Sequence, residues 1–339
     1  MMAYAPEIMF AILLLSLALY MALDGFDLGV GTLALIERDP EHKHEMMESI
    51  ATVWDGNESW LVLAAAVLFA GFPAAFGVIL PALYVPLIVM IAALTFRGVA
   101  FEFQAQHEGY DRRWGLSFAV GSLVAAFSQG VALGALLQGI SISGGDFTGG
   151  ALDFLSPFSL LCGVLITALY ALSGAGWLAA KTTGELLQSS RGRGRTLAII
   201  CAALIPATSA AALAASPPLA SLLDGASVTR LALAGVSLAA AMTALAGSYA
   251  LLGRRDDWSP LALGCAVTVA ALAFAVAAVY PHLVPGQLTL HESAAPESSA
   301  WLLLAFSLPL VPVTIAYNAF AYWVFRGKMH SPEGEQTSH

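Results

Sequence analysis

The chain has 339 residues, of which 58% are hydrophobic and only 11% are charged, whereas a soluble domain usually carries about 25% charged residues. Apolar stretches of about twenty residues, long enough to cross a membrane as a helix, recur to the end of the chain. We therefore predict an all-α polytopic membrane protein. The net charge of −9 does not indicate nucleic-acid binding in such a protein, and we expect no nucleic-acid partner.

The apolar stretches predict about nine membrane spans in one helical bundle. The break between the second and third is the least distinct, because it rests on Pro73, Pro81 and Pro86 within a run that is too long for one crossing. The connections are short, so we expect a single transmembrane helical domain over residues 1–328 and a short cytoplasmic tail over 329–339. The predicted spans cover residues 8–36, 59–78, 80–101, 115–138, 157–180, 196–215, 228–252, 260–280 and 300–325.

Basic residues give the orientation, because Lys and Arg concentrate in cytoplasmic loops. Of the 14 basic residues, 12 lie in the first, third, fifth and seventh connections and in the tail, and only Arg97 and Arg230 lie in or at the edge of a span. The pattern predicts an outer N-terminus and a cytoplasmic C-terminus. It also makes the stretch "RGRGR", residues 191–195, a cytoplasmic turn.

The first span carries two acids, Asp24 and Asp27, in the stretch "ALDGFDLGVG". Their i, i+3 spacing places them on one helix face, and Gly25 and Gly29 form a Gly-x-x-x-Gly pattern that lets another helix approach closely. We expect this face to point into protein. The acids either pair with neighbouring groups for packing or form a path for protons or cations, which is the default expectation for acids within a membrane.

A second polar cluster, "VWDGNESWL", opens the second span on the predicted cytoplasmic side. Asp55 and Asn57 are good helix N-caps, and Trp54 and Trp60 fit an interfacial aromatic belt. The presence of both Asp55 and Glu58 at this helix end predicts a role beyond helix capping. With the two acids of the first span, they would form a descending series of carboxylates open to the cytoplasm.

Four further features bear on function. Arg97, near the end of the third span, can reach the interface or pair with an acid, and Gln138 ends the fourth span in "GALLQG". The last span ends in "YNAFAYWVFRGK", which we interpret as an aromatic anchor. None of the seven histidines lies in the middle of a span. Since haem needs an axial ligand at suitable depth, we expect this chain to bind no haem and no metal.

The motifs "LDGFDLGVG", "WDGNESWL", "FRGVAFEF", "GALLQG" and "AYWVFRGK" occur in this order along the chain. In this the sequence resembles subunit II of the cytochrome bd family of quinol oxidases, which includes the cyanide-insensitive branch. The likeness runs through nearly the whole chain and is strongest over residues 23–103 and 317–328. It implies a multi-pass protein of the bacterial cytoplasmic (inner) membrane, associated with membrane lipids and the quinol pool.

The resemblance also implies a complex and roles for single residues. The partner, subunit I, would carry haems b and d and the quinol-oxidising loop, and the complex would oxidise quinol and reduce O2 to water with protons drawn from the cytoplasm. Asp55 matches the acid that lines a proton path at the subunit interface, Asp24 and Asp27 match its neighbours, and Trp60 matches a tryptophan near a proposed oxygen route. Arg97 and Gln138 become candidate interface or path residues. A structural quinone in this subunit and a small accessory subunit are compatible with the resemblance.

The alternative from a different class is a proton-coupled secondary transporter that uses Asp24 and Asp27 as its coupling site. Transporters of this kind tend to contain inverted repeats and paired broken helices. We find neither in the sequence. Haem that co-purifies with the chain would favour the oxidase, and a colourless single polypeptide would favour the transporter.

Overall fold

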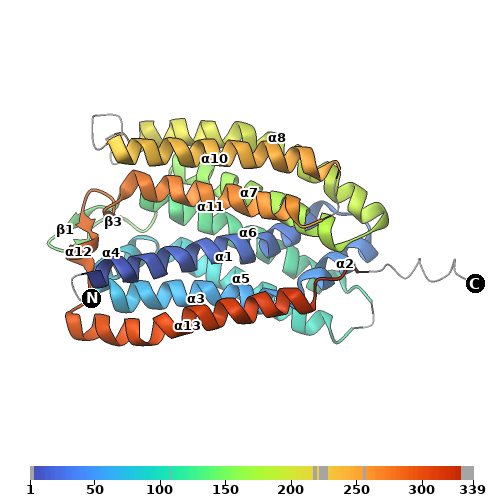
Figure 1. Cartoon of the computed structure of the whole chain (residues 1–339), viewed down its shortest axis with the longest axis horizontal. Coiled ribbons are helices and arrows are strands. Elements are labelled where there is room, and N and C mark those ends of the chain that lie inside the picture. Colours follow the sequence, from blue (N-terminus) through green and yellow to red (C-terminus); the bar gives the residue numbers. More distant parts are fainter. Residues whose placement is uncertain (1–3, 108, 217–219, 221–227, 255–256, 330–339) are drawn as a thin grey trace, which may run out of the picture.

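The structure is a computed structural model that describes residues 4–107, 109–216, 220, 228–254 and 257–329. It is a bundle of long helices that share one axis, with two small antiparallel hairpins at one end (Figure 1). The elements are α1 (Ala5–Ile36), α2 (Pro40–Ile50), α3 (Trp54–Gly71), α4 (Pro73–Ala82), α5 (Tyr84–Gln104), α6 (Arg112–Gln138), β1 (Ile142–Ser143), β2 (Asp146–Phe147), α7 (Pro157–Lys181), α8 (Gly184–Ala215), α10 (Val228–Leu252), α11 (Ser259–Val279), β3 (His282–Val284), β4 (Leu288–Thr289), α12 (Leu290–Ser293) and α13 (Glu297–Val324).

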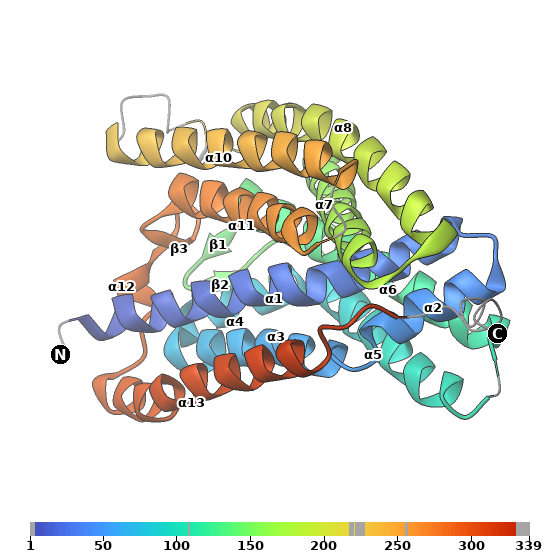
Figure 2. The ribbon, with the colours of Figure 1, turned by 45° about the vertical axis from the view of Figure 1, so that its right-hand side comes forward.

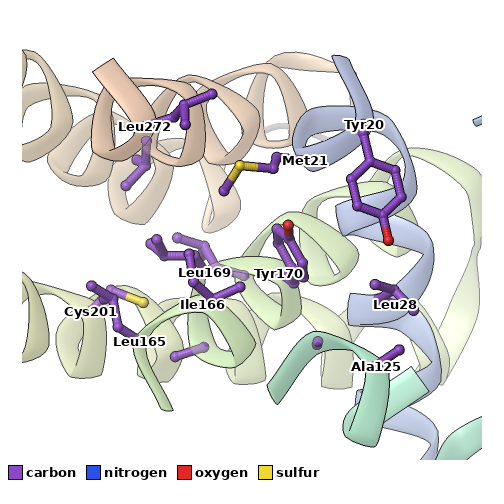
Figure 3. Close-up of a cluster of buried hydrophobic side chains, with 14 of the residues drawn as sticks. Tyr20, Met21, Leu28, Ala125, Leu165, Ile166, Leu169, Tyr170, Cys201 and Leu272 are labelled. Atoms are coloured by element: carbon purple, nitrogen blue, oxygen red, sulfur yellow. The ribbon is translucent and has the colours of Figure 1, made fainter. Parts of the chain in front are cut away.

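Helix α1 runs through the centre of the bundle. It packs against α3, α6, α7 and α11, and Figure 2 shows it between the pair α3 and α13 on one side and α10 and α11 on the other. The main core lies here: Tyr20 and Leu28 of α1 meet Leu169 and Tyr170 of α7, with Leu272 of α11 nearby (Figure 3). The second half of α1 is therefore well enclosed, with every residue from Asp24 to Gly31 buried.

Among the described residues, eight helices are long and apolar enough to cross a membrane. Seven of them coincide within a few residues with predicted spans, and α8 contains the predicted span 196–215 but begins earlier, at Gly184. This confirms the all-α polytopic class. The ninth is α3, whose 18 residues begin with the polar sequence of the second cluster and so are less apolar. The start of α1 and the end of α13 lie at opposite ends of the bundle (Figure 1). Which side of a membrane each end faces stays a prediction, and residues 330–339 of the predicted tail lie outside the described residues.

Two predicted boundaries are wrong. The second span was expected to reach residue 78, but α3 ends at Gly71 and residues 73–82 form α4, a separate short helix at the end of the bundle that holds the hairpins. The chain turns at Phe72 because Pro73, the first residue of α4, has no backbone N–H to continue α3. The stretch 191–195, predicted as a turn, lies inside α8. No proline interrupts the first half of that helix, and glycine alone does not end a helix.

Candidate functional site

Two fully buried carboxylates lie on one face of α1. Asp24 and Asp27 both have 0% relative exposure, as expected from their spacing on a helix whose face points into protein. Burying a carboxylate is costly unless it is paired or hydrogen-bonded. Each of the two acids has a partner, and the partners come from α3 and α5.

Asp24 is paired with Arg97 of α5. The Arg97 Nη2 atom lies 2.7 Å from Asp24 Oδ1 and also 2.7 Å from Oε2 of Glu58 on α3. Arg97 has 0% exposure, whereas the Glu58 side chain is 28% exposed. One guanidinium nitrogen therefore connects a buried carboxylate with a carboxylate that solvent can reach.

Asp27 has a different set of partners. Asn57 of α3 donates a hydrogen bond from Nδ2 to Asp27 Oδ2 at 2.8 Å, and the Tyr322 hydroxyl of α13 donates to Asn57 Oδ1 at 2.8 Å. Asn57 is 1% exposed. The other carboxylate oxygen of Asp27, Oδ1, is buried and accepts no hydrogen bond from the described residues.

The glycines of the first motif have the predicted effect. A Cβ atom on Gly25 would lie 2.6 Å from the Tyr170 ring of α7, and one on Gly29 would lie 1.8 Å from the Tyr170 carbonyl oxygen. No side chain fits at either position, so α7 contacts the backbone of α1 directly. This close contact seals the side of α1 that faces α7, next to the two acids.

The remaining predicted residues take no part in the contacts described above. Asp55, the acid that the resemblance emphasised, is exposed. Trp60 is buried in the main core at 1% exposure, and not at an interface as the aromatic-belt interpretation expected. Gln138 is at the far end of α6, where its Oε1 accepts a hydrogen bond of 2.6 Å from the Ser156 hydroxyl. Gln138 therefore belongs to a helix-end contact outside the acid cluster.

Sequence reasoning missed two members of the cluster. Asn57 was interpreted as a helix cap, and Tyr322 as part of a membrane anchor. Both interpretations are common for residues at helix ends, and the only signal against them was the presence of both residues in the motifs "WDGNESWL" and "AYWVFRGK".

The charges of the cluster do not balance. Three carboxyl groups, those of Asp24, Asp27 and Glu58, share the single guanidinium of Arg97. Full ionisation would leave two uncompensated negative charges among these four residues, and like charges close together in a buried site oppose each other's ionisation. Such a cluster can take up and release protons.

The fold and the site define a class: a polytopic helical membrane protein with a buried cluster of acids, of which Glu58 is partly exposed. The sequence matches the family described as cytochrome bd terminal oxidase subunit II over residues 5–325. The chain therefore belongs to this family and is a subunit of a quinol-oxidising enzyme complex.

Individual relatives agree with this assignment. The cytochrome bd-I ubiquinol oxidase subunit 2 of Escherichia coli K12 is 28% identical over 93% of each chain. The cytochrome bd ubiquinol oxidase subunit 2 of Bacillus subtilis is 26% identical, over 98% of this chain and 99% of that one. The structure of bd oxidase from Geobacillus thermodenitrificans has the same fold, with a TM-score of 0.78 at 20% identity, over 95% of this chain and 98% of the matched chain.

Proposed function

We propose that this chain is the haem-free subunit II of a terminal oxidase that couples quinol oxidation to the reduction of O2 to water. It would support subunit I in the bacterial cytoplasmic membrane and contribute a proton path from the cytoplasm. The observation that carries the proton path is the connection from Glu58 through Arg97 to Asp24, with 2.7 Å between Arg97 Nη2 and each carboxylate.

The path begins at the N-terminal end of α3, where Asp55 and Glu58 lie. Asp55 is exposed and can collect protons from water, while the partly exposed Glu58 reaches the buried cluster. Asp24 and Asp27, one turn apart on α1, would carry the proton further from solvent. The contact of Gly25 and Gly29 with α7 keeps this part of the path closed to bulk water.

Arg97 allows the proton to move without leaving a buried charge unpaired. When Glu58 is protonated, the guanidinium still pairs with Asp24. When the proton has moved on to Asp24, the guanidinium pairs with the ionised Glu58. The positive charge therefore stays fixed while the negative charge changes place, which limits the cost of burial.

The test is turnover of the purified complex with saturating quinol. Replacement by Asn keeps the size and hydrogen bonding of Asp but removes its titratable group. We expect Asp24→Asn and Asp27→Asn to assemble with normal haem spectra and to lose most oxygen consumption, and Asp55→Asn to lose less. The matched control is Asp146→Asn, an exposed acid at the opposite end of the bundle. Full turnover in a well-assembled Asp55→Asn and Asp27→Asn double variant would contradict the proton path.

The haem-free role is supported by the positions of the histidines. None of the described ones lies in a long helix of the bundle: His42 and His44 are in α2, His107 follows α5, His282 is in β3 and His291 is in α12. The haems expected on subunit I would supply the electrons and the O2 site. This chain expressed alone should contain no stoichiometric haem, and a pyridine haemochrome assay that finds about one haem per chain would contradict this. The transporter alternative is not favoured, since the chain belongs to the oxidase family.

A further inference from the structure

Helix α13 lies on the surface of the bundle, and one of its contacts reaches the acid cluster. Most of its side chains are exposed on the surface of the bundle. Near its last turn, the Tyr322 ring lies beside the stacked rings of Phe26 of α1 and Trp177 of α7, 6.4 Å from the first and 6.1 Å from the second. Both contacts are edge-on, and the Tyr322 hydroxyl is directed at Asn57.

The segment that follows α13 holds this end in place. The Lys181 ammonium at the end of α7 donates hydrogen bonds to the carbonyl oxygens of Phe325 and Gly327, and the Met329 backbone N–H donates to the Lys181 carbonyl oxygen at 2.8 Å. The position of Tyr322 is therefore set by three helices and by the docked segment.

The direction of the hydrogen bonds decides what this contact does. An amide has a donor end and an acceptor end. Because the Tyr322 hydroxyl donates to Asn57 Oδ1, the Asn57 NH2 group is turned toward Asp27, where it donates to Oδ2. An N–H donor favours an ionised carboxylate. It also occupies Oδ2, so Oδ1 remains the atom of Asp27 that can accept a proton.

We infer that Tyr322 is a positioning residue for proton transfer: through Asn57 it fixes the orientation of the Asp27 carboxylate and leaves Oδ1 as its proton-accepting atom. This inference rests on the proposed function of Asp27 as a proton carrier. Tyr322 itself transfers no proton, since the amide between it and Asp27 is not a proton carrier. Without the hydroxyl, the Asn57 amide is free to turn its oxygen toward Asp27. The N–H donor that favours the ionised carboxylate is then lost.

The first test is a double-mutant cycle in the assembled oxidase. Tyr322→Phe removes only the hydroxyl, and Tyr317→Phe is the matched control, because Tyr317 is on the same helix and 63% exposed. We expect Tyr322→Phe to lower the maximal turnover roughly three- to tenfold, the size expected from one hydrogen bond, with normal haem content and an unchanged KM for quinol. Added to Asp27→Asn, it should cause no further loss, since both changes act on the same carboxylate.

The second test is the redox-induced infrared difference spectrum, which a merely structural role of Tyr322 would not move. The carboxyl band that Asp27→Asn removes should shift in Tyr322→Phe and stay in place in Tyr317→Phe. An unshifted band, or losses that multiply in the double variant, would overturn the inference and leave Asp27 as a proton carrier without help from Tyr322. If Asp27→Asn removed no band and kept full turnover, the proposed function itself would fail at Asp27.

Discussion

Gly174 of α7 lies directly against Gly29 of α1, so close that a Cβ atom on Gly174 would be 2.5 Å from the backbone of Gly29. The contact brings the two backbones together beside Asp24 and Asp27. The same crossing therefore contributes to the packing of the bundle and to the enclosure of the acid cluster.

Replacing Gly29 should separate the two helices. In Gly29→Ala the new Cβ would lie 1.8 Å from the Tyr170 carbonyl oxygen, and overpacking of this kind typically costs about 1–3 kcal/mol. We expect a lower yield of assembled complex and a lower melting temperature. The control is Gly235→Ala in α10, where nothing lies within 4 Å of the added methyl. Equal stability of the two variants would contradict the close contact.

Removal of the Arg97 charge should damage assembly more than removal of either acid. Arg97→Gln leaves buried carboxylates without a counter-charge, and breaking a buried pair in this way typically costs about 3–5 kcal/mol. Arg97→Lys keeps the charge and should recover part of the loss. Arg112→Gln, at an exposed position, is the control. The measurement is the haem-containing complex recovered per milligram of membrane protein; a normal yield for Arg97→Gln would rule out a structural pair.

Glu37, at the end of α1, should contribute stability that depends on pH. Partial burial alone would raise its pKa, but hydrogen bonds from the Arg38 and Asp39 backbone N–H groups and the Arg193 guanidinium outweigh this and hold the pKa below the ordinary value of 4.5. A lowered pKa stabilises the fold at neutral pH, and this contribution disappears as the pH falls through the folded-state pKa. Glu37→Gln should therefore lower the melting temperature by about 2–4 °C at neutral pH.

The difference in melting temperature between Glu37→Gln and the wild type should narrow as the pH is lowered from 4.5 through the folded-state pKa of Glu37. Thermal melts of the assembled complex across this range measure it. Glu41→Gln, at an exposed acid in the first turn of α2, is the control. If the difference in melting temperature between Glu37→Gln and the wild type stayed constant down to low pH, the role of the Glu37 charge would be contradicted.

The orientation of the chain can be tested with fusions after Lys328. Since the basic connections are predicted to be cytoplasmic, a C-terminal green fluorescent protein should fluoresce. A phosphatase that needs the periplasm should be inactive at the same position. An active phosphatase there would reverse the predicted orientation.

Sequence patterns predicted the helices well because membrane spans are long, apolar and marked by charged connections. They failed at Phe72 and at residues 191–195. The first failure arose because Pro73, Pro81 and Pro86 lie in one apolar run, and the sequence does not show which of them follows the end of a helix. The second arose because arginine and glycine typically mark a turn, whereas here a long helix tolerates them and Arg193 of that helix pairs with Glu37 at 2.7 Å.

The acid cluster was predictable only in part. The spacing of Asp24 and Asp27 on one helix reveals their shared face, and a buried acid implies a partner. The partner's identity depends on which helix lies opposite, and spacing within a single helix carries no information on that. Arg97 was therefore a candidate without an assigned acid, and Tyr322, almost the whole chain away from Asp27 in sequence, had no signal that connected the two.

The hydrogen-bond chain from Asp27 to Tyr322 joins the first helix of the chain to the last. During synthesis α1 and α3 enter the membrane long before α13 leaves the ribosome. Until then, the Asn57 oxygen has no donor from Tyr322 and the Asp27 carboxylate is not held in its final orientation. The acid cluster thus reaches this arrangement only after the whole chain has been made and inserted, so a nascent or truncated chain lacks the hydrogen bond from Tyr322 to Asn57.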